Sequence, residues 1–128
     1  MDKLFLDANV VVDFLCERSD FYLPSARLMV KSYNKEVELC CSTLTLATAS
    51  YFMERSKVSH ADIFHKISDM ISICELADVD RDVVEQALSS GFTDFEDALQ
   101  SFSAKKMGCR HYYHTKQEGF LELTASSL

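Results

Sequence analysis

The 128-residue chain contains few of the residues that interrupt regular structure: three glycines and one proline. It also has no tryptophan, although hydrophobic residues make up 48% of its composition. So few glycines exclude a glycine-rich phosphate loop, and so many apolar side chains argue against a disordered tract. We therefore expect one compact domain over residues 1–128, with a single core and short connections.

The chain also lacks long apolar runs and regular cysteine motifs. No basic region followed by a long apolar stretch opens the chain, and no run is long enough to span a membrane. The sequence thus predicts neither a signal peptide nor a membrane segment. The five cysteines are odd in number and show no CxxC spacing, at Cys16, Cys40, Cys41, Cys74 and Cys109. We interpret them as buried small hydrophobic side chains in a reducing, cytoplasmic compartment.

Basic side chains are in the minority, with 13 Lys and Arg against 20 Asp and Glu, a net charge of −7. This balance argues against a protein that binds nucleic acid through a broad basic face. It does not exclude an enzyme whose acidic cluster is filled by divalent cations, because such cations invert the local charge.

Two kinds of apolar pattern alternate along the chain. Short apolar runs typical of buried strands lie at 4–6, 37–41, 71–77 and 109–114, with a weaker candidate at 120–123. Helical spacing covers 10–16, 25–35, 44–55, 59–71, 80–88 and 93–107. This alternation predicts an α/β fold with a parallel sheet.

An acid stands directly after the first predicted strand. Asp7 follows the apolar run, and Asn9 precedes the apolar helix that begins at Val10. The carboxyl ends of strands in an open α/β sheet border the crevice where ligands bind, so Asp7 is a candidate metal ligand. Asp and Asn are also common caps of helix N-termini. This stretch alone leaves both interpretations open.

A second acidic cluster opens the last predicted helix, at Thr93-Asp94-Phe95-Glu96-Asp97. Asp94 and Asp97 are three residues apart and would share a helical face. Two clustered acids and a third from a strand end can hold Mg²⁺ or Mn²⁺, which support phosphodiester hydrolysis. The alternative is a capping box from Thr93 to Glu96, with acids that complement the helix dipole. That alternative explains Asp97 less well, and we favour the metal.

Three stretches in this order resemble the PIN-domain family: LFLDANVVVDFL at 4–15, DFEDAL at 94–99 and YYHT at 112–115. The similarity runs from about Lys3 to Phe120. The resemblance implies a three-layer α/β/α sandwich with a mostly parallel central sheet, here of four to five strands. It also implies a ribonuclease that depends on Mg²⁺ or Mn²⁺. Many bacterial members are toxins of the VapC type, held in check by an antitoxin.

The resemblance assigns roles by position. Asp7 matches the first metal-binding acid of the family, and Asn9 matches the small polar residue beside it, which we take as a substrate contact. Asp97 matches the acid that opens the helix motif, with Asp94 as an additional acid one turn earlier. Thr115 matches the hydroxyl residue after the last core strand, where it would orient a water or a phosphate.

Two departures from the family pattern bear on activity. The family often has a Glu in the helix after the second strand, where this chain has Thr48. The loop after Thr115 usually carries an acid, where Glu118 or Gly119 stands here in a loop shorter by one residue. Lys116 enters this loop and is our candidate phosphate contact.

Other polar residues are given structural roles. Asp13 lies six positions after Asp7, on a different helical face, and we expect it to be solvated or salt-bridged. His111 and His114 flank two tyrosines, Tyr112 among them, on a predicted strand, and no metal-binding spacing joins the histidines.

The leading hypothesis is therefore a metal-dependent endoribonuclease acting on RNA phosphodiesters. A rival of another class is a catalytically weak or inactive PIN-like domain that binds RNA or a protein, as the two departures would allow. A third interpretation takes every acid as a helix cap in a structural domain. The predicted helices at 25–33 and 59–71 carry apolar surface that would suit a homodimer or an antitoxin.

Overall fold

The computed structural model describes residues 2–17, 20, 22–109, 111–115 and 121–125, with 113–115 and 121–125 described by their backbone. The elements in chain order are β1 (Lys3–Leu6), α1 (Ala8–Leu15), α2 (Tyr22–Tyr33), β2 (Glu38–Ser42), α3 (Thr43–Arg55), α4 (His60–Ser72), β3 (Glu75–Ala77), α5 (Arg81–Leu88), α6 (Phe95–Lys106), β4 (His111–Thr115) and β5 (Leu121–Ala125). The strand order is β3-β2-β1-β4-β5. The first four strands run parallel, and β5 is antiparallel to β4. The predicted α/β fold with a mostly parallel sheet is confirmed.

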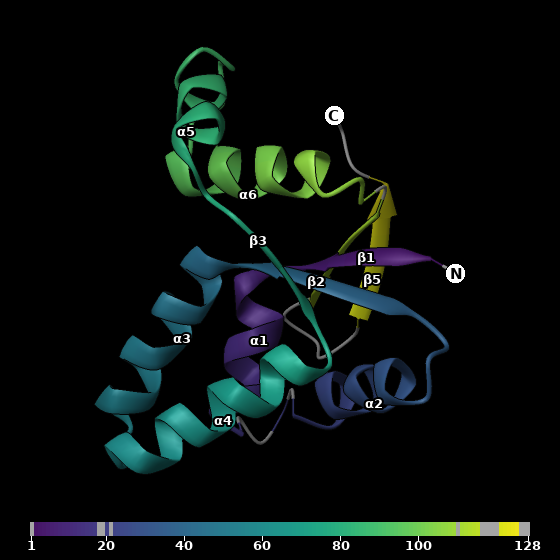
Figure 1. The fold of residues 1–128 in the computed structure, drawn as a ribbon, viewed down its shortest axis with the longest axis vertical. Helices are drawn as coiled ribbons and strands as arrows, with labels where there is room; N and C mark the ends of the chain where they lie inside the picture. Colours follow the sequence, from purple (N-terminus) through teal and green to yellow (C-terminus); the bar gives the residue numbers. More distant parts are fainter. Residues whose placement is uncertain (1, 18–19, 21, 110, 116–120, 126–128) are drawn as a thin grey trace.

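Helices cover both faces of this sheet. Figure 1 shows α1, α2, α3 and α4 on one side, and α5 and α6 on the other. Successive side chains of a strand point to opposite faces, and β1 follows this rule. Leu4 and Leu6 belong to the apolar cluster with α1–α4, whereas Phe5 packs in a cluster with Ala104 of α6. Burial on both faces explains the continuous apolar run in β1 and confirms the three-layer sandwich.

Several helices of this chain have a left-handed residue just after the last turn. After α6 this residue is Gly108, with φ +78°. The N–H groups of Gly108 and Cys109 donate to carbonyl oxygens three and five residues earlier, each at 3.0 Å, which is the Schellman arrangement. Lys35 and Lys57 take the same place after α2 and α3, with φ +61° and +65°.

Several predicted boundaries are wrong. The helix predicted at 25–35 is α2 at Tyr22–Tyr33, and the helix predicted from Val10 begins at Ala8. The predicted strand at 71–77 is shorter, because Ile71 lies in the last turn of α4 and only Glu75–Ala77 forms β3. The apolar, β-branched residues at this junction fit a strand as well as a helix end, and the pattern alone could not divide them. The helix predicted from Thr93 begins at Phe95, because Asp94 is its N-cap.

The cysteines behave as the composition predicts. Those at 40, 41, 74 and 109 are buried, and Cys16 is half-buried. Cys41 and Cys74 pack in the cluster under α1–α4, and Cys40 and Cys109 in the cluster under α6. Among the described helices, none is both long and apolar enough to cross a membrane.

Candidate metal centre

Asp7 stands at the carboxyl end of β1, where the parallel strands lead into their helices. Its extended backbone, with φ −62° and ψ 149°, makes it the N-cap of α1. Oδ2 accepts a hydrogen bond from the N–H of Asn9 at 3.0 Å, and Oδ1 accepts one from the hydroxyl of Tyr112 at 3.3 Å. A carboxylate oxygen has two lone pairs, so these bonds leave acceptor sites on Asp7 for a cation. The cap and the metal ligand are therefore compatible roles.

Two further acids lie together at the start of α6. Asp94 is the N-cap, and its Oδ1 accepts a hydrogen bond from the N–H of Asp97 at 2.9 Å. The predicted capping box from Thr93 to Glu96 is therefore wrong. Asp94 therefore lies just before α6 and Asp97 is the third residue within it, so both acids stand at the start of this helix.

The charges of Asp7 and Asp94 act on the carboxyl group of Asp97. Asp97 is exposed at the start of α6, but partial desolvation raises the pKa of its carboxyl above its ordinary value, and the negative charges of Asp94 and Asp7 raise it further. Asp7 is remote from Asp97 in sequence, so the fold brings the end of β1 toward the start of α6. Repulsion of this kind disfavours the charged form of Asp97, and a divalent cation beside these acids would relieve it.

The chemistry of this donor set fits a hard cation, because Mg²⁺ and Mn²⁺ prefer carboxylate oxygens. As the side chains lie, no group of three or more His, Cys, Asp or Glu residues in the described part of the chain is close enough to hold a metal ion. The acids form an open cluster rather than a finished cage. Cation binding would then need side-chain movements, with water or substrate completing the shell as Mg²⁺ usually requires.

Tyr112 is a member of this cluster that sequence reasoning missed. It pairs in register with Phe5 of β1, and the two ring centroids lie 5.5 Å apart. Burial raises the pKa of the Tyr112 phenol well above its usual range, and the charge of Asp7 and its hydrogen bond raise it further. The phenol therefore remains protonated and acts as a donor. Only the pairing of β4 with β1 reveals this contact, and the local pattern carries no sign of it.

Of the remaining candidate site residues, the structure describes Asn9 and the backbone of Thr115. Asn9 is exposed, and its backbone N–H rather than its side chain contacts Asp7. Thr115 ends β4, where its backbone pairs with Leu121 of β5. The Thr115 side chain lies outside the described part of the chain, as do Lys116, Glu118 and Gly119. Their expected roles stay predictions.

Thr48 on α3 and Asp13 on α1 are the two other helical positions that the sequence singled out. Thr48, which stands where the family often has Glu, is half-buried on α3, and its hydroxyl donates to the carbonyl of Leu44 at 3.1 Å. Asp13 is only 2% exposed, so of its two expected states the solvated one is wrong, and the salt bridge stays a prediction. Asp13 is carried inside because α1 packs against α2, α3 and β4, which leaves this short helix little open surface.

A buried hydrogen-bond network fixes α6 to the end of β2. Gln100, one turn after Asp97, is 2% exposed. Ser42 Oγ donates to Gln100 Oε1 at 2.9 Å, and Gln100 Nε2 donates to Thr45 Oγ1 at 2.8 Å. Ser42 is also the N-cap of α3 and accepts from the N–H of Thr45 at 3.1 Å. The network therefore links α6 to β2, the neighbour of the strand that carries Asp7.

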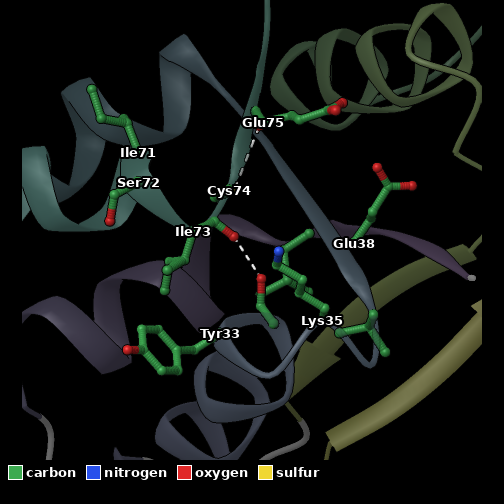
Figure 2. Close-up of a pocket in the computed structure, with 11 residues that line it drawn as sticks. Tyr33, Lys35, Glu38, Ile71, Ser72, Ile73, Cys74 and Glu75 are labelled. Atoms are coloured by element: carbon green, nitrogen blue, oxygen red, sulfur yellow. Dashed lines mark hydrogen bonds between the residues drawn. The ribbon is translucent and has the colours of Figure 1, made fainter.

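A separate cavity of about 570 Å³ opens at the other end of the strands, where β2 and β3 begin. Figure 2 shows it between the ends of α2 and α4, with Tyr33 and Ile71 at its border. Of the acids that line it, Glu75 is paired with the ammonium of Lys3 at 3.3 Å. None of the predicted site residues lines this cavity. The acidic cluster is therefore the better candidate for the chemistry.

Known proteins resemble this chain in sequence and in fold. Residues 3–111 match the family model described as the PIN domain. Ribonuclease VapC1 of Aquifex aeolicus (strain VF5) is 29% identical over an alignment of 114 residues, and the match covers 85% of this chain and 78% of the relative.

Two solved structures share the fold at low identity. Mycobacterium tuberculosis VapC20, described as a sarcin-ricin loop cleaving toxin, has a TM-score of 0.68 at 15% identity and covers 91% of this chain and 92% of its own. VapBC2 from Rickettsia felis, bound to a DNA fragment from their promoter, has a TM-score of 0.54 at 18% identity and covers 84% and 83%. The family model spans most of the residues, and together with the sandwich architecture it shows that the chain belongs to the PIN-domain family.

Proposed function

We propose that this chain is a metal-dependent endoribonuclease that hydrolyses RNA phosphodiester bonds, and that it serves as the toxin of a toxin–antitoxin pair. The observation that carries the proposal is the placement of the acids, with Asp7 at the carboxyl end of β1 and Asp94 and Asp97 at the start of α6, near enough for the charges of Asp7 and Asp94 to act on Asp97. Its relatives support the reaction, because one is named a ribonuclease and another is described as a toxin that cleaves the sarcin-ricin loop.

In this proposal Asp7, Asp94 and Asp97 hold Mg²⁺ or Mn²⁺ through carboxylate oxygens. A divalent cation supplies an activated water and offsets the charge that develops on the phosphate. The chain's own part is to hold the acids: the N–H of Asn9 fixes one oxygen of Asp7, and the N–H of Asp97 fixes one oxygen of Asp94. Thr115 orients the water or phosphate.

In this proposal the cation also reduces the repulsion between the acidic protein and RNA. The net charge is −7, and RNA is a polyanion, so an acidic cluster without a cation repels the phosphate that it must receive. Neutralising the cluster is then a condition for RNA binding as well as for catalysis. Lys116 supplies the phosphate contact and Asn9 a further substrate contact in this proposal.

The proposed assembly is a cytoplasmic homodimer of single-domain chains, each covering residues 1–128, which an antitoxin protein inhibits. Large apolar side chains exposed on α2 and α4, including Leu23, Tyr33 and Phe64, provide surface for a second copy or for the antitoxin. The solved VapBC2 structure supports a protein partner, since its description refers to a pair of proteins that share a promoter.

A titration of Mn²⁺ into the purified protein by calorimetry tests the metal centre without knowledge of the RNA. We expect saturable binding to the wild type that is lost in Asp7→Asn and in Asp97→Asn. Asp62→Asn is the matched control, because Asp62 occupies the third residue of α4 as Asp97 does in α6. Its affinity for Mn²⁺ should equal that of the wild type.

Cleavage of a mixed RNA substrate then tests the reaction. Activity should require Mg²⁺ or Mn²⁺, stop with EDTA and be lost in Asp7→Asn and Asp97→Asn. Wild-type protein that binds no divalent cation and cleaves no RNA would refute the proposal. Full activity in both variants would place the chemistry at another site.

A further inference from the structure

Tyr112 lies where the sheet meets the start of α6. In the parallel register Tyr112 stands beside Phe5, and both pack on the sheet face that α6 covers. From this place the phenol reaches the carboxyl end of the neighbouring strand, where its hydroxyl donates to Oδ1 of Asp7 at 3.3 Å. The charges of Asp97 and Glu96, in the first turn of α6, also act on the Tyr112 phenol. One hydroxyl therefore stands close to both chain segments that build the acidic cluster.

The two hydrogen bonds of Asp7 have a geometric consequence. The N–H of Asn9 engages Oδ2 and the hydroxyl of Tyr112 engages Oδ1, so each oxygen of the carboxylate is bound by a different donor. A carboxylate held at one oxygen can still rotate about its Cβ–Cγ bond, whereas a carboxylate held at both oxygens cannot. In the second case the lone pairs of Asp7 that are not used in these bonds keep a fixed direction toward a bound cation. Partners of metal ligands that act in this way typically change metal affinity 10- to 100-fold when they are removed.

We propose that Tyr112 is a positioning residue of the metal centre, whose hydroxyl fixes the carboxylate plane of Asp7 for the cation. The inference rests on the proposed metal-dependent function. The hydroxyl is not needed for packing, because the Phe5 contact is made through the ring and a phenylalanine would keep it. A side chain that faces the core from a parallel strand needs only to be apolar. The Tyr112 hydroxyl instead reaches Asp7 at the carboxyl end of β1.

The test compares Mn²⁺ affinity by calorimetry in the wild type, Tyr112→Phe and Tyr51→Phe. Tyr51 is the matched control, because its hydroxyl also takes part in a hydrogen bond, from Arg55 at 2.9 Å, on the exposed side of α3. We expect the Kd of Tyr112→Phe for Mn²⁺ to rise at least about 10-fold, while Tyr51→Phe keeps the wild-type value. Titration well below each protein's melting temperature keeps all three folded, so a loss of stability alone leaves the Kd unchanged.

Each other outcome has one meaning. Equal affinity in the wild type and Tyr112→Phe overturns the positioning role and leaves the proposed function intact. An equal loss of affinity in Tyr51→Phe also overturns it, because the effect would then be unrelated to Asp7. A wild type that binds no Mn²⁺ overturns the proposed metal centre, and the role of Tyr112 with it.

Discussion

Gln100→Leu is the substitution that best tests how α6 is held against the sheet. The two side chains have similar volumes, so the change removes hydrogen bonds without opening a large cavity. The lost bonds are those from Ser42 Oγ at 2.9 Å and to Thr45 Oγ1 at 2.8 Å. The Ser42 hydroxyl keeps Thr45 Oγ1 as an acceptor at 3.3 Å, so it does not lose every partner.

The expected cost follows from this count. A buried hydrogen bond contributes about 1 kcal/mol net, so two lost bonds lower the free energy of unfolding by about 2 kcal/mol. The entropy of unfolding for 128 residues is about 0.27 kcal/mol per kelvin, so the melting temperature should fall by about 7 °C. With an m-value of about 1.5 kcal/mol/M, the urea midpoint should fall by about 1.3 M.

Equilibrium urea unfolding followed by circular dichroism measures this loss. Gln86→Leu is the matched control, because the Gln86 amide donates to Asp82 Oδ2 at 3.0 Å on the exposed side of α5. That change should cost less than about 0.5 kcal/mol. Combining Gln100→Leu with Thr45→Val should cost less than the two single changes together, because the residues share a bond. A Gln100→Leu protein as stable as the wild type, or a Gln86→Leu protein equally destabilised, would refute the reasoning.

Two further predictions concern stability. Lys57→Gly should raise the free energy of unfolding by about 0.5–1 kcal/mol, because glycine adopts φ +65° without strain. Gly108→Ala should lower the free energy of unfolding by about 1 kcal/mol, because alanine is strained at φ +78°. Thermal melts of the two variants test both changes. Nothing lies within 4 Å of a Cβ added at Gly108, so a larger loss would contradict the backbone explanation. In metal-free buffer, Asp97→Asn should raise the melting temperature at neutral pH, because the folded pKa of Asp97 lies above its unfolded value and ionisation therefore costs stability. That gain should vanish below about pH 3.9, where the acid is protonated in both states, and a gain that persists in melts at lower pH would contradict the sign.

Local signals predicted much of the fold. The apolar run before Asp7 located β1, because a buried parallel strand is marked by a few adjacent apolar residues. The first helix was predicted from Val10 but begins at Ala8, because Asp7 rather than Asn9 is its N-cap. Gly108 marked the end of α6. The start of α6 was misplaced because Thr93 and Asp94 are both good caps, and only the bond from Asp94 to the N–H of Asp97 decides between them.

Contacts between elements that are distant in the chain could not be predicted from the sequence. The hydrogen bond between Tyr112 and Asp7 exists because β4 pairs beside β1, and alternating strands and helices do not state the order of strands in a sheet. Gln100 reads as a surface residue, since glutamine is mostly exposed in proteins. Its burial depends on Ser42 and Thr45 meeting it from another layer, which no local pattern around Gln100 contains.

From the sequence, helix cap and metal ligand were alternative roles for the acids. In the structure Asp7 and Asp94 can fill both roles at once. Asp7 and Asp94 are both N-caps, yet both also raise the pKa of Asp97 through their charge. A cap needs only a side-chain oxygen, which Asn supplies as well as Asp, whereas an electrostatic site needs the charge. Replacing either Asp by Asn therefore keeps the cap and removes the charge, so the same change separates the two roles. If the acids are caps alone, these variants should match the wild type in every property that depends on divalent cations.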